Sequence, residues 1–191
     1  MLQRHTLPVL LLITIFCGIS DALEVPPLPF EVVVRSADVV FRGTVVRVES
    51  SWVSTESGPA IVTRVTFRVE RALKGKLGAE LSLEFLGGRV GDEVLEVVGA
   101  PRFEVGQRDV ICAQVDDRYV SPITGFNQGR FRINRDGTSG HEYVTTSSGL
   151  QVMSGAADSR TRTLSLSLTT GGTRLESFEE EVLRLVQMSS K

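Results

Sequence analysis

Hydrophobic and polar residues alternate along several short segments of the chain. In Thr63–Glu70, Val65, Phe67 and Val69 are expected to face inward, while Thr66 is expected to face solvent. A period of two is typical of a β-strand in a sheet with one solvated face. This segment therefore predicts a half-buried strand.

Other segments have a strand-like composition. They are the valine-rich Ala37–Val48, the alternating Leu81–Phe85, Val94–Val98, the strongly apolar Asp109–Val115, the alternating Gly129–Asn134 and the short Leu164–Leu168. Gly43 interrupts the first segment, where a bulge or a sharp bend is expected. Asp109–Val115 is apolar on both faces, which predicts a buried central strand. In Gly129–Asn134, Phe131 and Ile133 are expected inward, with Arg130 and Arg132 outward.

Turn-forming residues separate these segments. They include Lys74-Gly75-Lys76, Asp116-Asp117 and Asp136-Gly137. The last pair is a hairpin-turn signal. Gly87, Gly88 and Gly91 predict a mobile connection, and the polar Ser147–Thr163 predicts a long surface loop.

The hydrophobic period changes near the C-terminus. Leu175, Phe178, Val182 and Leu185 recur at helical spacing, with charged residues between them. Thr173 and Glu176 fit a capping box, so an amphipathic helix is expected over residues 173–188. A helix of about 16 residues is marginal alone and needs a partner surface. The pattern as a whole predicts a mainly β fold, a small antiparallel barrel or a curled sheet with this helix closing one side.

The N-terminal segment has the pattern of a signal peptide. Arg4 precedes the apolar run Leu7–Ile19, whose length of about 13 residues is short of the ~20 that a spanning helix needs. Ser20 and Ala22 are small residues at the positions expected of a cleavage site. We therefore expect residues 1–22 to be a signal peptide and residues 23–191 to be a single domain. The expected location is periplasmic or extracellular, with no stable membrane insertion after cleavage.

Composition narrows the possible chemistry. The chain has 23 acidic and 21 basic residues and a net charge of −2, which argues against a dedicated nucleic-acid binder. Cleavage after Ala22 would leave Cys112 and His141 as the only cysteine and histidine. No internal disulfide is then expected, and no metal site or cofactor is indicated.

Two stretches resemble the netrin-like module, the family that includes the tissue inhibitors of metalloproteinases. They are FEVVVRSADVVFRGTVV (Phe30–Val46) and TRVTFRVERALKG (Thr63–Gly75). Val105-Gly106-Gln107 then leads into the expected buried strand, in the corresponding order. The segment GAPRFEVGQRDVI (Gly99–Ile111) also resembles a group of bacterial secreted proteins of unassigned role.

The resemblance implies an OB-type five-stranded barrel with a short N-terminal helix. In the metalloproteinase inhibitors, a disulfide-bonded cysteine at the mature N-terminus chelates the catalytic zinc. This chain is expected to begin at Leu23 and has no cysteine there. That inhibitory mechanism is therefore not implied, and no functional residue is carried over.

The sequence offers no strong candidate for a set of catalytic residues. His141 is the only candidate histidine base, and the neighbouring Asp136–Gly140 is not a G-x-S-x-G elbow. A hydrolase that uses His141 is therefore disfavoured. Cys112 has apolar neighbours, which indicates a buried and inert thiol. The acidic residues Asp92, Glu93 and Glu96 fit a solvated hairpin edge better than a metal loop.

An arginine face is the remaining candidate surface. Arg64, Arg68, Arg130 and Arg132 are expected to face solvent, but no exposed aromatic residues accompany them as in single-strand binders. Trp52 and Tyr119 are expected near loop ends, where aromatic residues can contact a partner. We favour a solvated face and no nucleic-acid partner.

The leading hypothesis is a secreted, non-enzymatic binding module with an unknown protein partner. The alternative within binding is a protease inhibitor of netrin-like type that acts on a secreted protease without an N-terminal cysteine. Because loops usually carry recognition in small barrels, Gly87–Pro101 and Ser147–Thr163 are the candidate recognition segments. No catalytic, metal-binding or cofactor-binding residue is assigned.

Overall fold

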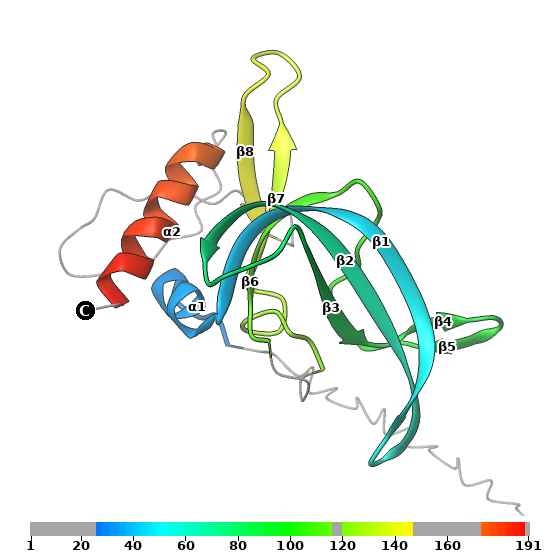
Figure 1. Ribbon diagram of the computed structural model, residues 1–191. Helices are drawn as coiled ribbons and strands as arrows, with labels where there is room; N and C mark the ends of the chain where they lie inside the picture. Colours follow the sequence, from blue (N-terminus) through cyan, green and yellow to red (C-terminus); the bar gives the residue numbers. More distant parts are fainter. Residues whose placement is uncertain (1–25, 116–119, 147–172, 190–191) are drawn as a thin grey trace, which may run out of the picture.

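The computed structural model describes residues 26–115, 120–146 and 173–189 (Figure 1). Several sequence predictions lie outside these residues. They are the signal peptide 1–22, the Asp116-Asp117 turn, Tyr119, the loop Ser147–Thr163 and the strand Leu164–Leu168. Within the described residues, the fold is mainly β with two helices, as expected. None of the described helices is long and apolar enough to cross a membrane.

A long β-hairpin forms the centre of the sheet. It consists of β1 (Val39–Thr55) and β2 (Gly58–Lys74), both rich in β-branched residues. Glu56 and Ser57 form the turn between them. The expected irregularity at Gly43 is confirmed, because the register shifts between Arg42 and Gly43. A side chain at Gly43 would approach the Arg68 carbonyl oxygen to 2.9 Å, which explains the glycine.

The remaining long strands extend this hairpin on both sides. They are β3 (Glu80–Leu86), β6 (Arg108–Ala113), β7 (Arg130–Arg135) and β8 (Glu142–Thr146). All pairs are antiparallel, in the order β3-β2-β1-β6-β7-β8. Of the two expected forms, the sheet is therefore the curled one, with edges at β3 and β8. The expected central strand is confirmed in β6, which lies between β1 and β7 and is buried from Asp109 to Ala113.

A separate short hairpin lies where the sequence predicts a mobile connection. It consists of β4 (Gly88–Val90) and β5 (Glu93–Leu95), and it contacts β1 and β2. Gly91 adopts a φ of 61° in its turn. In Figure 1 this hairpin projects beside the far end of β3.

Two helices cover one face of the sheet. They are α1 (Phe30–Ser36) and α2 (Leu175–Ser189), on the left in Figure 1. The predicted C-terminal helix is confirmed, but its cap is one residue later than expected. The first helical bond runs from the Phe178 N–H to the Arg174 carbonyl, so Arg174 and not Thr173 is the N-cap.

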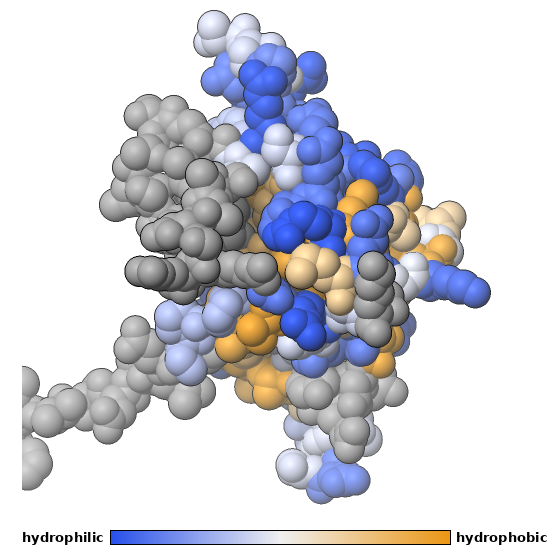
Figure 2. All heavy atoms as spheres, turned by 90° about the vertical axis from the view of Figure 1, so that its left-hand side faces the viewer, coloured by the Kyte–Doolittle hydropathy of each residue, from blue (hydrophilic) through white to orange (hydrophobic). Residues whose placement is uncertain are grey.

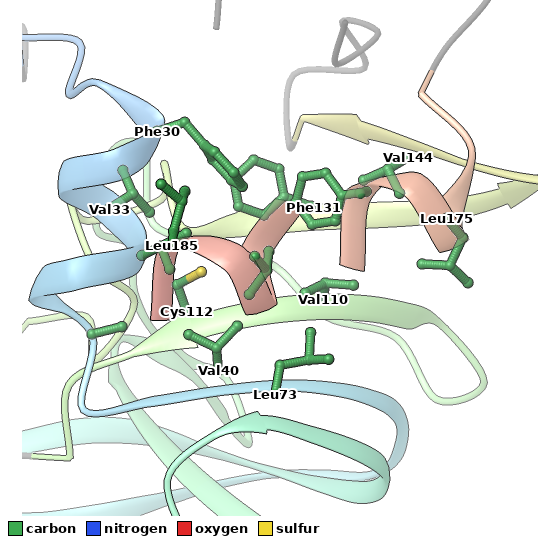
Figure 3. Packing of buried hydrophobic residues seen from close by; sticks show 14 residues of the cluster. Phe30, Val33, Val40, Leu73, Val110, Cys112, Phe131, Val144, Leu175 and Leu185 are labelled. Atoms are coloured by element: carbon green, nitrogen blue, oxygen red, sulfur yellow. The ribbon is translucent and has the colours of Figure 1, made fainter. Parts of the chain in front are cut away.

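The helix-side cluster is the hydrophobic core between these helices and the sheet (Figure 3). Three aromatic rings lie at its centre, from α1, β7 and α2, with Phe30 and Phe131 centroids 5.5 Å apart and Phe131 and Phe178 centroids 4.9 Å apart. The four apolar positions predicted for α2 all face this cluster and are buried: Leu175, Phe178, Val182 and Leu185. Figure 2 shows the outside of this region, where hydrophobic surface is interspersed with hydrophilic surface.

The concave-side cluster lies on the other face of the sheet. Phe41, Phe67 and Phe103 form its aromatic centre, with successive ring centroids 5.4 Å apart. Val65 and Phe67 are buried here and Val69 packs against them, so the predicted alternation of β2 is confirmed. The sheet is therefore covered on both faces over its central strands.

Two predictions of solvent exposure are wrong. Thr66 is 3% exposed, and its hydroxyl lies 2.9 Å from that of Ser82 on β3. Arg130 is 2% exposed. The alternation in β7 is correct, since Phe131 joins the helix-side cluster, but the opposite face is covered by Phe103 rather than by water.

Candidate functional site

The candidate histidine lies in the turn between β7 and β8. His141 is exposed, and its carbonyl accepts a hydrogen bond from the Asp136 N–H at 2.9 Å. The Ser139 hydroxyl lies 3.0 Å from Asp136 Oδ1, and this carboxylate also accepts the main-chain N–H groups of Ser139 and Thr138. These hydrogen bonds lower the pKa of Asp136. The segment thus has the geometry of the predicted hairpin turn, and the hydrogen bond of the Ser139 hydroxyl stabilises this turn.

Cys112 lies in the helix-side cluster on β6. Its side chain is 0% exposed, and burial raises the pKa of the thiol to about 12. The thiolate, which is the reactive form, is therefore strongly disfavoured at neutral pH. The prediction that Cys112 is buried is confirmed.

The acidic residues of the β4–β5 region point to solvent. Asp92, Glu93 and Glu96 are all exposed, and Glu96 forms an ion pair with Arg102. Among the described residues, no group of three or more histidine, cysteine or acidic side chains is close enough to hold a metal ion. This region fits the expected solvated hairpin edge.

The four arginines of the expected face are not brought together. Arg64 and Arg68 are exposed on β2, where Arg64 pairs with Glu84 at 2.5 Å. Arg132 is half-buried on β7, and Arg130 is buried in the concave-side cluster. Trp52, 46% exposed, lies near the end of β1 as expected. A continuous basic face is therefore absent from this part of the described sheet.

Arg130 forms a buried ion pair with Asp109 of β6. Two of its nitrogens each lie 3.2 Å from an Asp109 oxygen, and both side chains are at most 2% exposed. The guanidinium carbon lies 3.9 Å from the ring centroid of Phe103, a cation–π contact. Burial raises the pKa of Asp109 and lowers that of Arg130, so desolvation opposes both charges.

A second ionic network connects α2 to the sheet on the helix side. Glu179 is 2% exposed and accepts hydrogen bonds from Arg42 at 2.9 Å and Arg71 at 2.5 Å. Arg42 also lies 3.0 Å from Glu70, as an ion pair without an aligned hydrogen bond. Glu70 in turn pairs with Arg108 at 2.8 Å. The network joins elements far apart in sequence, so its evident effect is to position α2.

A groove beneath β4 and β5 is a candidate binding site. Its volume is about 480 Å³, and it lies over the concave face between β1–β3 and the segment 87–103. The floor is apolar and is formed by Val48, Val65, Phe85 and Phe103. The exposed side chains of Arg89, Glu96 and Arg102 form a charged rim. One predicted recognition segment, Gly87–Pro101, thus supplies much of one wall.

One wall of this groove depends on a close approach of the backbone at Gly87 and Gly88 to the sheet. The Ser50 and Thr63 hydroxyls are 2.9 Å apart, and the Thr63 hydroxyl donates to the Gly87 carbonyl at 2.7 Å. Gly88 has a φ of 144°, and a side chain there would lie 2.3 Å from the Thr63 hydroxyl oxygen. Only glycine allows the chain to cross the sheet at this point.

Sequence reasoning missed both Ser50 and Thr63 as partners of this crossing. The available signal was the pair Gly87-Gly88 directly after an alternating strand, which is typical of close backbone approach as well as of flexibility. The burial of Arg130 had no such local signal, because its partners Asp109 and Phe103 are distant in sequence.

No protein-family model, curated protein or solved structure matches this chain. The groove and the two ionic clusters must therefore be interpreted from their own chemistry.

Proposed function

We propose that this chain is an exported, non-enzymatic binding module that holds an apolar side chain of a protein partner in the groove beneath β4 and β5. The observation that carries the proposal is the composition of this groove. An apolar, partly aromatic floor lies below a rim of exposed charges of both signs. Protein interfaces have the same arrangement, in which a large apolar anchor fills a pocket and a polar rim surrounds it.

The walls of the groove support selective binding. The floor is anchored in the concave-side cluster, where Phe85 and Phe103 pack with ring centroids 5.1 Å apart. The opposite wall is held by the hydrogen bonds of Gly87 to Thr63 and Ile61. A groove with both walls fixed loses little conformational freedom when a ligand enters, which favours affinity.

The order of elements supports the netrin-like resemblance. A short helix precedes the first strand, and the second strand ends at Lys74 before Gly75, whose φ is 80°. The return strand β6 then pairs with β1. Protease inhibition is the alternative proposal, with the same groove as the contact surface and a secreted protease as the partner.

The proposal is tested with a matched pair of variants at neighbouring valines. Val97 lines the groove, whereas Val98 is 92% exposed and does not. Random peptides displayed on phage are selected on the wild-type chain and then measured on Val97→Arg and Val98→Arg. We expect enriched peptides with a large apolar residue that bind the Val98 variant normally and lose about tenfold or more in affinity to the Val97 variant.

Three results would contradict the proposal: no enrichment of any peptide, equal binding to both variants, or loss of binding to the Val98 variant alone. The thermal midpoint of each variant shows whether it is folded. For the inhibitor alternative, the same two variants are compared in their ability to slow a panel of secreted proteases.

A further inference from the structure

The two edges of the six-stranded sheet differ in how their main-chain groups are hydrogen-bonded. At β8, the Val144 N–H donates to the Thr173 carbonyl at 3.0 Å, and Tyr143 forms a bridge with Arg174. The segment before α2 therefore covers that edge. At β3, the pairing with β2 extends over Arg68–Val62, and on the outer side the described residues supply a main-chain partner only at Leu86.

The direction of the free main-chain groups on β3 follows from two hydrogen bonds. The Gly87 N–H donates inward to Ile61 of β2 at 2.8 Å, whereas the Leu86 N–H donates outward to Val120 at 3.0 Å. Main-chain groups of successive residues in a strand point to opposite sides. Ser82 and Glu84 therefore direct their N–H and C=O groups outward, as Leu86 does. Such a row is a template for an added strand.

A groove beside this edge offers room for that strand. Its volume is about 850 Å³, and its lining includes Ser82, Glu84 and Leu86 of β3 together with Val115, Val120 and Pro122. Val115 and Val120 are 57% and 43% exposed. These apolar side chains provide contacts beyond the main-chain hydrogen bonds. The Leu86–Val120 hydrogen bond shows that the outward main-chain groups of β3 can accept a partner at this end of the strand.

The side chains of β3 define the chemistry of the occupant. Glu80 and Glu84 are exposed on one face, while Leu83 and Phe85 are buried on the other. Glu84 is paired with Arg64, but both are about half exposed, so this ion pair is weak and its carboxylate stays accessible. Opposite charges on adjacent strands attract and like charges repel. The edge thus favours basic residues beside Glu80 and Glu84, and it disfavours a second copy of the same acidic strand.

We propose that β3 binds an extended polypeptide segment that alternates basic and apolar residues and joins the sheet as an added strand. The basic residues lie beside Glu80 and Glu84, and the apolar residues lie over the exposed valines of the adjoining groove. Main-chain hydrogen bonds from Ser82 and Glu84 fix the segment. This site adjoins the groove beneath β4 and β5, with which it shares Phe85, Leu86 and Leu95, whereas Val97 lines only the groove beneath β4 and β5.

The test uses a short synthetic peptide of alternating lysine and valine, with a glutamate–valine peptide as control. Amide hydrogen exchange of the chain from Leu23 to Lys191 is followed by NMR. We expect the lysine peptide to slow exchange at Ser82 and Glu84 by about tenfold or more, because these amides acquire acceptors. Leu83 and Phe85 already face β2, so their exchange should not change. The glutamate peptide should have no effect.

Matched variants separate main-chain pairing from charge. Ser82→Pro removes the outward N–H, whereas Ser82→Ala keeps it, so only the proline variant should lose the peptide. Glu80→Lys with Glu84→Lys should reverse the preference between the two peptides. Val97→Arg should leave this binding unchanged, which separates it from the proposed function. The wild-type exchange measurement does not depend on the folding of any variant.

Several outcomes would overturn the inference. One is the absence of lysine-peptide binding, and another is binding without slower exchange at Ser82 and Glu84. A third is slow exchange of both amides in the free protein, which would mean that a segment of this chain already covers the edge.

Discussion

The two hydrophobic clusters on opposite faces of the sheet are closed in different ways. The helix-side cluster is covered by α1 and α2 through apolar side chains, and its charged residues lie at the margin, where Glu179 holds α2. No helix of the described residues covers the concave-side cluster. A fully buried ion pair, Arg130 with Asp109, closes one end of it against Phe103.

The difference shows where each region is vulnerable. When a buried apolar side chain is truncated, the loss of unfolding free energy grows with the number of buried groups removed. A buried ion pair instead costs desolvation energy that its mutual attraction only offsets while both partners are present. We therefore expect the concave-side cluster to tolerate loss of the whole pair better than loss of one partner.

The largest effect is expected for Asp109→Ala. This change leaves the Arg130 charge buried without its carboxylate, and breaking a buried pair costs about 3–5 kcal/mol of unfolding free energy. Chemical denaturation of the two proteins measures the difference. The control is the double variant Asp109→Leu with Arg130→Met, which should recover most of the loss. A double variant less stable than Asp109→Ala would show that the pair is stabilising as a unit.

The second effect is at the margin of the helix-side cluster. Glu179→Ala removes the acceptor of two arginines, and hydrogen bonds to charged groups contribute about 1.5–3 kcal/mol. We expect a smaller loss than at Asp109 because Arg42 and Arg71 can still reach water. Glu180→Ala, at an exposed neighbour, should change unfolding free energy by less than about 0.5 kcal/mol. Equal losses at Glu179 and Glu180 would contradict the role of the network.

Local patterns predicted the elements of both regions. The alternation at Val65 and Phe67 and the helical spacing around Phe178 each identified an element and its buried face. These signals are local, because strand and helix periods follow from backbone geometry. The full lengths of β1 and β2 were not predicted, since their ends are fixed by mutual pairing rather than by composition.

The candidate site could be predicted only in part. The sequence indicated Gly87–Pro101 as a recognition segment, and the structure places it over a groove. It did not indicate Arg130 or Thr66 as buried, because their exposure depends on residues distant in sequence, Phe103 for Arg130 and Ser82 for Thr66. Such tertiary contacts leave no periodic pattern in the sequence.

A smaller effect is expected for Thr66→Ala, on the face of β2 opposite to Val65 and Phe67. Thr66 is buried, and its hydroxyl bonds that of Ser82, so its removal should cost about 0.5–1.5 kcal/mol. A double-mutant cycle with Ser82→Ala measures the coupling between the two hydroxyls. Additive losses would indicate that the two hydroxyls contribute independently.

The smallest effect is expected at Glu70, in the partly exposed part of the ionic network that connects α2 to the sheet. It should appear as a pH dependence of the unfolding free energy. The hydrogen bond from Arg108 is the main cause that lowers the pKa of Glu70 from 4.5 to about 2. The carboxylate of Glu70 binds a proton less readily in the folded state than in the unfolded state. Its contribution to the unfolding free energy is therefore complete above pH 4.5 and is lost as the pH falls towards 2. Water screens these charges, so the contribution should be less than that of Glu179. In denaturation measured across this range, Glu70→Gln should lose less stability than the wild type as the pH falls. If both proteins lose stability in parallel, the ion pairs of Glu70 contribute nothing measurable, and the network stabilises the fold through Glu179 alone.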